Sequence, residues 1–293
     1  MGKQQMANIL KYALIAALVV LIMLLPAVLQ NPYYLRVIQM AAMFSLLGLG
    51  LNFLFGYTGQ ISLGHAAFYA IGAYVTAILE TKYGVHFLIA WIIALVFSAI
   101  ISCLISFPIL KLKGHYLAMA TLAFGLIVET VLRQWKSLTG GHDGITLMTQ
   151  TILGEWFAGH LYYFIVGSAI LVFWLLHNLP RSSVGRAQRA LRDDEDAAEA
   201  LGIPVRKHKV FAFVLSSVIA SLAGIWYAHF AMVITPEVFS LHTSIQILMM
   251  VVIGGLASNA GAMLGAAFLI VLPEFLYSFQ ESTVFIYGII VLA

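Results

Sequence analysis

Charged side chains are scarce in this chain: Asp, Glu, Lys and Arg make up 9% of its 293 residues, whereas apolar residues make up 62%. A soluble domain of this composition would have too few polar side chains to cover its surface. Apolar runs recur along the whole length, and no hydrophilic stretch between them exceeds roughly thirty residues, far short of a soluble domain. The sequence therefore predicts one integral membrane domain over residues 1–293.

Cysteine is nearly absent, and several catalytic signatures are missing. The single Cys103 lies in an apolar run, which excludes an internal disulfide framework and a cysteine-based metal cluster. The sequence contains no Gly-x-x-x-x-Gly-Lys-Ser/Thr phosphate loop, so we do not expect the chain to hydrolyse ATP itself. His65, His86, His115 and His177 are scattered, unlike the histidines of a metal site or membrane-embedded enzyme. We expect no enzyme activity, no bound metal or cofactor, and no nucleic-acid partner.

The apolar runs predict an all-α, polytopic transmembrane helix bundle. A helix needs about 20 residues to cross about 30 Å of hydrocarbon. The runs of sufficient length are Tyr12–Leu29, Val37–Phe55, Ile61–Leu79, Phe87–Leu110, Tyr116–Leu132, Leu161–Leu179 and Val210–Ile234. Two shorter stretches, Ser244–Leu256 and Ala260–Leu272, are either one broken crossing or a re-entrant pair. The last run, Val284–Ala293, is too short to cross, so we expect the native chain to extend beyond Ala293.

The distribution of basic residues predicts the orientation. The first run lacks a small-residue cleavage pattern, so we interpret it as a retained helix rather than a signal peptide. With the amino terminus in the cytoplasm, eleven basic residues lie inside and four outside, in agreement with the retention of Lys and Arg on the cytoplasmic side. The four outside are Arg36, Lys82, Arg133 and Lys136. This orientation makes residues 134–160 an external loop and residues 181–209 a cytoplasmic loop.

Residues 181–209 form the one strongly charged segment and are predicted to contain a short amphipathic helix. Ser182 or Ser183 caps its start, Gly202 suits the left-handed residue after its end, and Pro204 prevents continuation. One face of the predicted helix is apolar and consists of Val184, Ala187, Leu191, Ala198 and Leu201. Such a helix either docks on a partner or rests on lipid headgroups. Five acidic residues in the segment weaken the second alternative, because anionic lipid repels them.

Two glycine-rich stretches, 56–68 and 254–265, interrupt the apolar pattern in opposite halves of the chain. Non-helical backbone at membrane depth persists only beside protein or a water-filled cavity. Interrupted segments in both halves of a transporter point to a permeation path, although close helix packing through small residues is an equal alternative. The candidate path residues are Gly56, Gly59, Gln60, Ser62, Gly64, His65, Gly254 and Gly255.

Several stretches resemble the branched-chain amino-acid permeases of ATP-binding-cassette (ABC) importers. They are residues 59–66, residues 110–124 with 137–144, and Ala198-Glu-Ala-Leu-Gly-Ile preceded by Ser183-Val-Gly-Arg-Ala; with the second glycine-rich stretch they cover most of the chain. The resemblance implies an importer permease fold in which segment 181–209 couples transport to a partner ATPase. The coupling residues it implies are Arg186, Arg189, Ala198, Glu199, Ala200 and Gly202.

The resemblance also implies an assembly in a bacterial or archaeal plasma membrane. Its other parts would be a second homologous permease, two cytoplasmic ATP-binding subunits that use ATP, and a periplasmic or extracellular amino-acid-binding protein facing loop 134–160. The substrate would be leucine, isoleucine or valine, and the alternative is a related importer for urea, amides or other amino acids. An ion-coupled secondary transporter would need carboxylates at mid-membrane. The predicted helices offer Glu129, which we expect to reach water at the external end.

Overall fold

The computed structural model describes residues 23, 25–26, 31–147, 157 and 159–274. The run predicted at Tyr12–Leu29 lies almost entirely outside these residues, and so do Val284–Ala293 and the stretch 148–156 of the predicted external loop.

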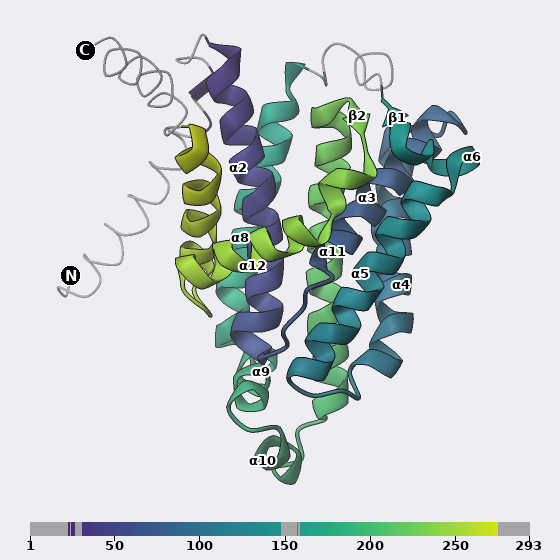
Figure 1. Ribbon diagram of the computed structural model, residues 1–293. Coiled ribbons are helices and arrows are strands. Elements are labelled where there is room, and N and C mark those ends of the chain that lie inside the picture. The colour runs from purple at the N-terminus through teal and green to yellow at the C-terminus, as the bar shows by residue number, and fades with distance from the viewer. Residues whose placement is uncertain (1–22, 24, 27–30, 148–156, 158, 275–293) are drawn as a thin grey trace, which may run out of the picture.

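Long helices dominate the described chain (Figure 1). They are α2 (Pro32–Leu51), α3 (His65–Thr81), α4 (Phe87–Ile109), α5 (His115–Gln134), α8 (Leu161–Asn178) and α11 (Val205–Ala231). Five helical segments are long and apolar enough to cross a membrane: Pro32–Gly56, Phe87–Ile109, His115–Gln134, Leu161–Arg181 and Val205–Ala231. The described residues also form one short antiparallel pair of strands, β1 (Ile145–Thr146) and β2 (Val233–Ile234). The prediction of a polytopic helix bundle is confirmed.

Three helices begin several residues away from the starts of their predicted apolar runs, among them α2, which begins at Pro32 rather than Val37. The predicted helix start at Ile61 is wrong, because residues 59–64 are non-helical and α3 begins at His65. Gly59, with φ +70°, ends the preceding helical turn in a conformation that glycine adopts without strain. Helix α11 begins five residues before the predicted Val210, because Pro204 ends the preceding turn and Arg206 and Lys207 supply an exposed polar first turn.

Helices α3 and α11 form the centre of the bundle. A Cβ on Gly72 would lie 2.1 Å from the carbonyl oxygen of Ser221, and a Cβ on Gly224 would lie 2.1 Å from that of Tyr69. The two backbones therefore touch through glycine on both sides, which is how helices pack closely in membranes. Helices α2 and α4 pack against the same pair.

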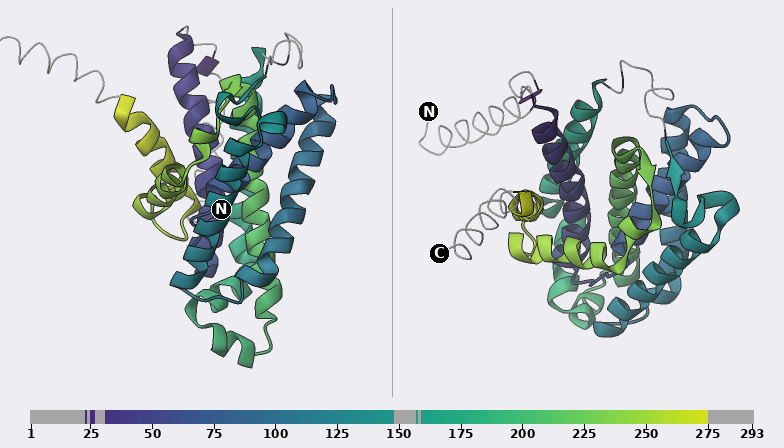
Figure 2. Two further views of the ribbon diagram at one scale, coloured as in Figure 1. Left: turned by 45° about the vertical axis from the view of Figure 1, so that its right-hand side comes forward. Right: turned by 45° about the horizontal axis from the view of Figure 1, so that its top comes forward.

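The carboxyl-terminal stretches form a re-entrant pair rather than one broken crossing. Helix α12 (Leu241–Gly254) runs across the long helices and does not follow them (Figures 1 and 2). After the turn at residues 255–258, the helix Asn259–Glu274 leads back toward the end of the bundle that carries β1 and β2. The chain thus enters and leaves this region from the same end.

The connections between the helices lie at the two ends of the bundle, in the two groups that the predicted topology requires. At one end lie α9 (Ser183–Asp193) and α10 (Glu195–Ala200) (Figure 1). The α4–α5 connection is at that end, since Lys113 Nζ lies 3.1 Å from Asp196 Oδ1. At the other end lie the strands, α6 (Lys136–Thr139), and the short helical turns η2 (Gly141–Asp143) and η4 (Pro236–Phe239). That the first end faces the cytoplasm stays a prediction.

Candidate functional site

The first interruption is non-helical backbone that other helices support. Helix α2 continues into the π-helical turn η1 (Asn52–Gly56), and the extended residues 59–64 then lead to the start of α3 inside the bundle (Figure 1). The Leu63 amide donates to Thr121 Oγ1 at 3.0 Å, and the Ala66 amide donates to Ser244 Oγ at 3.1 Å. Side chains of α5 and α12 therefore satisfy backbone groups that a continuous helix would have paired internally.

The second interruption is bonded to the first through Asn52. Its Nδ2 donates to Asn259 Oδ1 at 3.0 Å, and its Oδ1 accepts from the Ala257 amide at 2.9 Å. Asn52 is fully buried. A Cβ on Gly56 would lie 2.4 Å from Asn52 Oδ1 and 2.5 Å from the Ala257 nitrogen, so only glycine fits there. We call Asn52, Gly56, Ala257 and Asn259 the asparagine junction.

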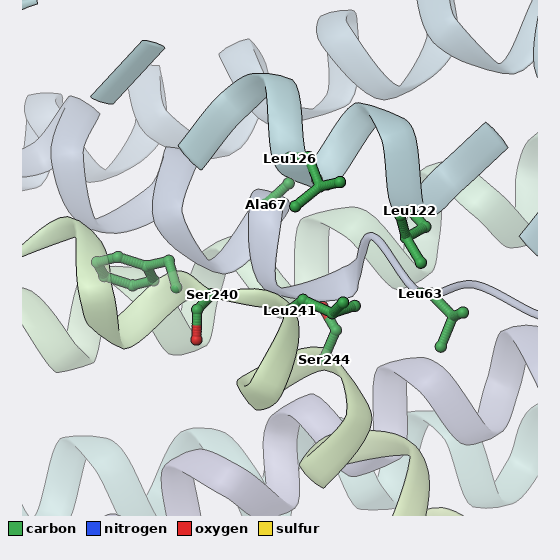
Figure 3. Close-up of a pocket in the computed structure, with 9 residues that line it drawn as sticks. Leu63, Ala67, Leu122, Leu126, Ser240, Leu241 and Ser244 are labelled. Carbon is green, nitrogen blue, oxygen red and sulfur yellow. The ribbon is translucent and has the colours of Figure 1, made fainter. Parts of the chain in front are cut away.

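A narrow cleft opens beside the first interruption. It is lined by residues of the extended segment, α3, α5, η4 and α12: Leu63, Ala67, Leu122, Gly125, Leu126, Phe239, Ser240, Leu241 and Ser244. Leu122 and Leu126 of α5 face Leu241 and Ser244 at the start of α12 (Figure 3). The wall is mainly aliphatic, with two serine hydroxyl groups at the amino-terminal end of α12. Its free volume of about 10 Å³ admits about one water molecule, so the cleft is closed to larger molecules.

None of the eight predicted path residues lines this cleft. A Cβ on Gly64 would lie 2.2 Å from the Thr121 carbonyl oxygen, and one on Gly254 would lie 2.1 Å from that of Gly261. Close packing therefore accounts for these two glycines, as it does for Gly56. Gly59 and Gly255 have positive φ, 70° and 97°. Gln60, Ser62 and His65 are all buried.

Sequence reasoning did not identify the residues that connect the two interruptions. It also did not identify the residues of α5, η4 and α12 that line the cleft. Asn52 and Asn259 carried a usable signal, because an amide within an apolar run needs a buried partner. Ser240 precedes an apolar helix, where a capping serine is common. Leu122 and Leu126 gave no signal, since an aliphatic side chain on a membrane helix is equally suited to face lipid.

Segment 181–209 forms two helices, so the prediction of a single helix was wrong. The backbone of Asp194 is extended, with φ −160° and ψ 115°, and its carboxylate accepts from the amides of Asp196 and Ala197. Aspartate is a better amino-terminal cap than a residue inside a helix, and here it starts α10. The predicted cap at Ser182 and the left-handed Gly202, with φ +80°, are confirmed.

The apolar face predicted for this segment is divided between the bundle and the surface. Leu191 and Ala198 are buried against the rest of the chain, whereas Leu201 is 81% exposed. Three of the predicted coupling residues, Glu199, Ala200 and Gly202, surround Leu201 and are also exposed. Arg186 and Arg189 are exposed, and they donate to the carbonyl oxygens of Arg181 and Pro180. We call residues 199–202 the α10 tip.

Segment 181–209 is bonded directly to the asparagine junction. Arg192, in the last turn of α9, donates from Nη1 to the Gly56 carbonyl oxygen at 2.8 Å. Lys209 at the start of α11 pairs with Glu195 of α10. Lys113 pairs with Asp196, and this hydrogen bond, together with the charges of Asp196 and Glu195, raises the pKa of Lys113. A displacement of α9 or α10 would therefore reach both interruptions.

Glu129, the acid predicted to reach water, is part-exposed and paired. Glu129 Oε1 lies 2.8 Å from Arg133 Nη2, and Arg133 Nη1 lies 3.3 Å from Glu237 Oε1 at the end of the bundle that carries β1 and β2. Glu80 is a further acid near this end. It lay one residue beyond the predicted run Ile61–Leu79, and it is buried beside His229.

Comparison with known proteins relates this arrangement to a family. The family described as "Branched-chain amino acid transport system / permease component" matches residues 33–293. The high-affinity branched-chain amino acid transport system permease protein LivM of Escherichia coli (strain K12) is 35% identical over 83% of this chain and 63% of its own length. LivM of Salmonella typhimurium is 34% identical over 85% and 65%, and LivH of Escherichia coli (strain K12) is 24% identical over 79% and 81%. The chain thus spans slightly less than two thirds of the two LivM proteins. No solved structure matches it.

Proposed function

The chain belongs to the branched-chain amino acid transport permease family, and from that premise we propose that it carries branched-chain amino acids across a prokaryotic plasma membrane as one half of an ATP-driven importer. It is a multi-pass membrane protein and a permease component rather than an enzyme. ATP would be hydrolysed by two cytoplasmic partner subunits. The similarity to both LivM and LivH supports pairing with a second, homologous permease.

One observation carries the proposal: the hydrogen bond from Arg192 to the Gly56 carbonyl oxygen. It joins the segment that would meet an ATPase to the asparagine junction, which holds both interruptions together. When the ATPase subunits close, a push on the α10 tip would pass through α9 to this junction. Movement of residues 59–64 relative to the start of α12 would then open the cleft, because both segments line it.

The chemistry of the cleft suits a branched-chain amino acid. Leu63, Leu122, Leu126 and Leu241 offer an aliphatic surface to an apolar side chain. The start of α12 carries the partial positive charge of a helix amino terminus, next to the hydroxyl group of Ser240, and both favour a carboxylate. A neutral urea molecule would use neither feature, so the alternative of a urea importer is less well supported.

The test is uptake of radioactive leucine into proteoliposomes that hold this chain, its partner permease and the ATPase subunits. We expect uptake to require ATP and an external binding protein. Competition by isoleucine and valine, but not by urea or acetamide, would support the substrate class. Uptake by this chain alone along an ion gradient would overturn the proposal.

A substitution separates docking at the α10 tip from folding. Leu201→Asp places a charge on the exposed apolar side chain of the tip, and we expect it to abolish leucine-dependent stimulation of the ATPase. The matched control is Leu112→Asp, in the α4–α5 connection at the same end of the bundle, where Leu112 is 39% exposed. Equal loss in both variants would show that the tip is not the docking surface.

A further inference from the structure

A carboxylate and an imidazole are buried together at the end of the bundle that carries β1 and β2. Glu80 lies in the last turn of α3, and His229 lies in the last turn of α11. Glu80 Oε1 is 3.5 Å from His229 Nε2, and both side chains are fully buried. Trp91 of α4 completes the group, because its indole N–H donates to the same His229 Nε2 at 2.9 Å. Three helices therefore meet at one nitrogen atom.

The hydrogen bonds around this nitrogen constrain where the protons are. An indole N–H is only a donor, so His229 Nε2 must be without a proton when Trp91 donates to it. If Glu80 were ionised, its carboxylate oxygen, which can only accept a hydrogen bond, would face this nitrogen, which is also an acceptor. Neither oxygen of Glu80 accepts a hydrogen bond from the residues that the structure describes. A buried carboxylate without donors is costly when ionised, and protonation removes that cost.

We propose that Glu80 and His229 form a buried proton-binding site that retains one proton. The proton has two positions. It rests on the Glu80 carboxyl group when Trp91 donates to a neutral His229. Alternatively, the proton moves to Nε2, Trp91 releases that nitrogen, and His229 and Glu80 become an ion pair. Both states have no net charge, whereas loss of the proton leaves a negative charge in the bundle.

The position of the proton is linked to the packing of α3, α4 and α11. Trp91 keeps its hydrogen bond to His229 in one state only, and its ring also packs edge to face on Trp226 of α11, with 5.0 Å between ring centroids. His229 lies shortly before Met232, which has φ +60°, and before strand β2. Because both states hold one proton, we expect them to differ in the packing at this end of the bundle and not in net charge.

Other titratable groups at this end have their own contacts. Lys82 donates to the Ser137 carbonyl oxygen, and Tyr74 donates to that of Ile234. The other charged or titratable side chains of these helices and of the segments beside them at this end include Tyr69, Tyr83, His86, Glu129, Arg133, Lys136, His142, Asp143, His160, Tyr162, Tyr163, Tyr227 and Glu237. Glu129 is the matched control for Glu80, because it is an acid near the same end whose carboxylate is paired with Arg133.

The test is infrared spectroscopy of the full chain in lipid nanodiscs at neutral pH, where a carboxyl group exposed to water is ionised. We expect wild type to show the C=O stretch of a protonated carboxyl group. Glu80→Gln should abolish this band, and Glu129→Gln should leave it unchanged. A spectrum that Glu80→Gln does not alter, or a band that Glu129→Gln removes equally, overturns the proposal.

A second variant, Trp91→Phe, leaves both members of the site in place. It removes the indole donor to His229 Nε2 and should move the proton from Glu80 toward that nitrogen, so the carboxyl band weakens. An unchanged band refutes the two-state arrangement. These measurements need no substrate or ATPase, so their failure is distinct from failure of the proposed transport function.

Discussion

The asparagine junction gives the sharpest quantitative prediction. Asn52→Ala removes both hydrogen bonds that join the two interruptions, whereas Asn259→Ala removes only the bond from Asn52 Nδ2. Hydrogen bonds between membrane helices contribute about 0.6 kcal/mol on average and up to about 1.7. Leaving a buried polar group unpaired costs about 1 to 3 kcal/mol. We expect losses in the free energy of unfolding of about 2 to 3 kcal/mol for Asn52→Ala and about 1 kcal/mol for Asn259→Ala.

The double variant tests whether the loss arises from the bond itself. Once Asn52 is gone, Asn259 has no bond to lose, so the double variant should be about as stable as Asn52→Ala alone. The coupling energy should therefore be about 1 kcal/mol. The measurement is equilibrium unfolding of the chain in mixed micelles with increasing dodecyl sulfate. The control is Asn178→Ala, where an exposed Asn178 donates to the Trp174 carbonyl oxygen, and a change within about 0.5 kcal/mol is expected.

Additive losses in the double variant would refute the bond between Asn52 and Asn259. They would mean that the two side chains act independently and that, of the two hydrogen bonds of Asn52, only the one from the Ala257 amide joins the interruptions.

Three further predictions test neighbouring parts of the site. Arg192→Met removes the donor to the Gly56 carbonyl oxygen, so the assembled importer should keep its ATPase activity while leucine uptake falls. Lys207→Met, which removes an exposed base at the start of α11 in the same segment, should transport normally. Gly64→Ala places a Cβ 2.2 Å from the Thr121 carbonyl oxygen, so a thermal unfolding assay should show no stable fold. The control is Gly167→Ala, where the nearest atom is 3.7 Å from the added Cβ, and it should be tolerated. Leu241→Ala enlarges the cleft, and we expect competition assays to show that preference shifts toward bulkier amino acids by about tenfold.

The sequence predicts the membrane helices well because hydrophobic length is a direct physical requirement of the bilayer. It predicts the interruption at residues 56–68 for a related reason, since glycine and hydrogen-bonding side chains are unusual in hydrocarbon. The start of α3 at His65 could not be predicted. Residues 61–64 are compatible with helix by composition. The Leu63 amide donates to Thr121, and the Ala66 amide at the start of α3 donates to Ser244, and both acceptors are distant in sequence.

The candidate site was predicted only as a region. The glycines identify where backbones approach closely, but the cleft itself is lined by leucines whose composition matches lipid-facing positions. A residue's orientation depends on which helix packs against it, and that is decided by contacts such as Gly72 on Ser221. Glu80 illustrates the same limit, because its burial depends on α11 bringing His229 beside it.

The break at Asp194 explains how one short segment serves two roles. A single straight helix over residues 183–200 would move as one body, and a partner bound to its end would push directly on α11. With the break, Gly185 presses α9 against the Leu179 carbonyl group, where a Cβ would lie only 2.3 Å from the oxygen, and Arg192 holds Gly56. Helix α10 meanwhile lies at the end of the bundle (Figure 1), and Leu201, which follows it, is exposed. A helix fixed to the junction and an exposed tip bound to a partner are the two parts that a mechanical coupling requires.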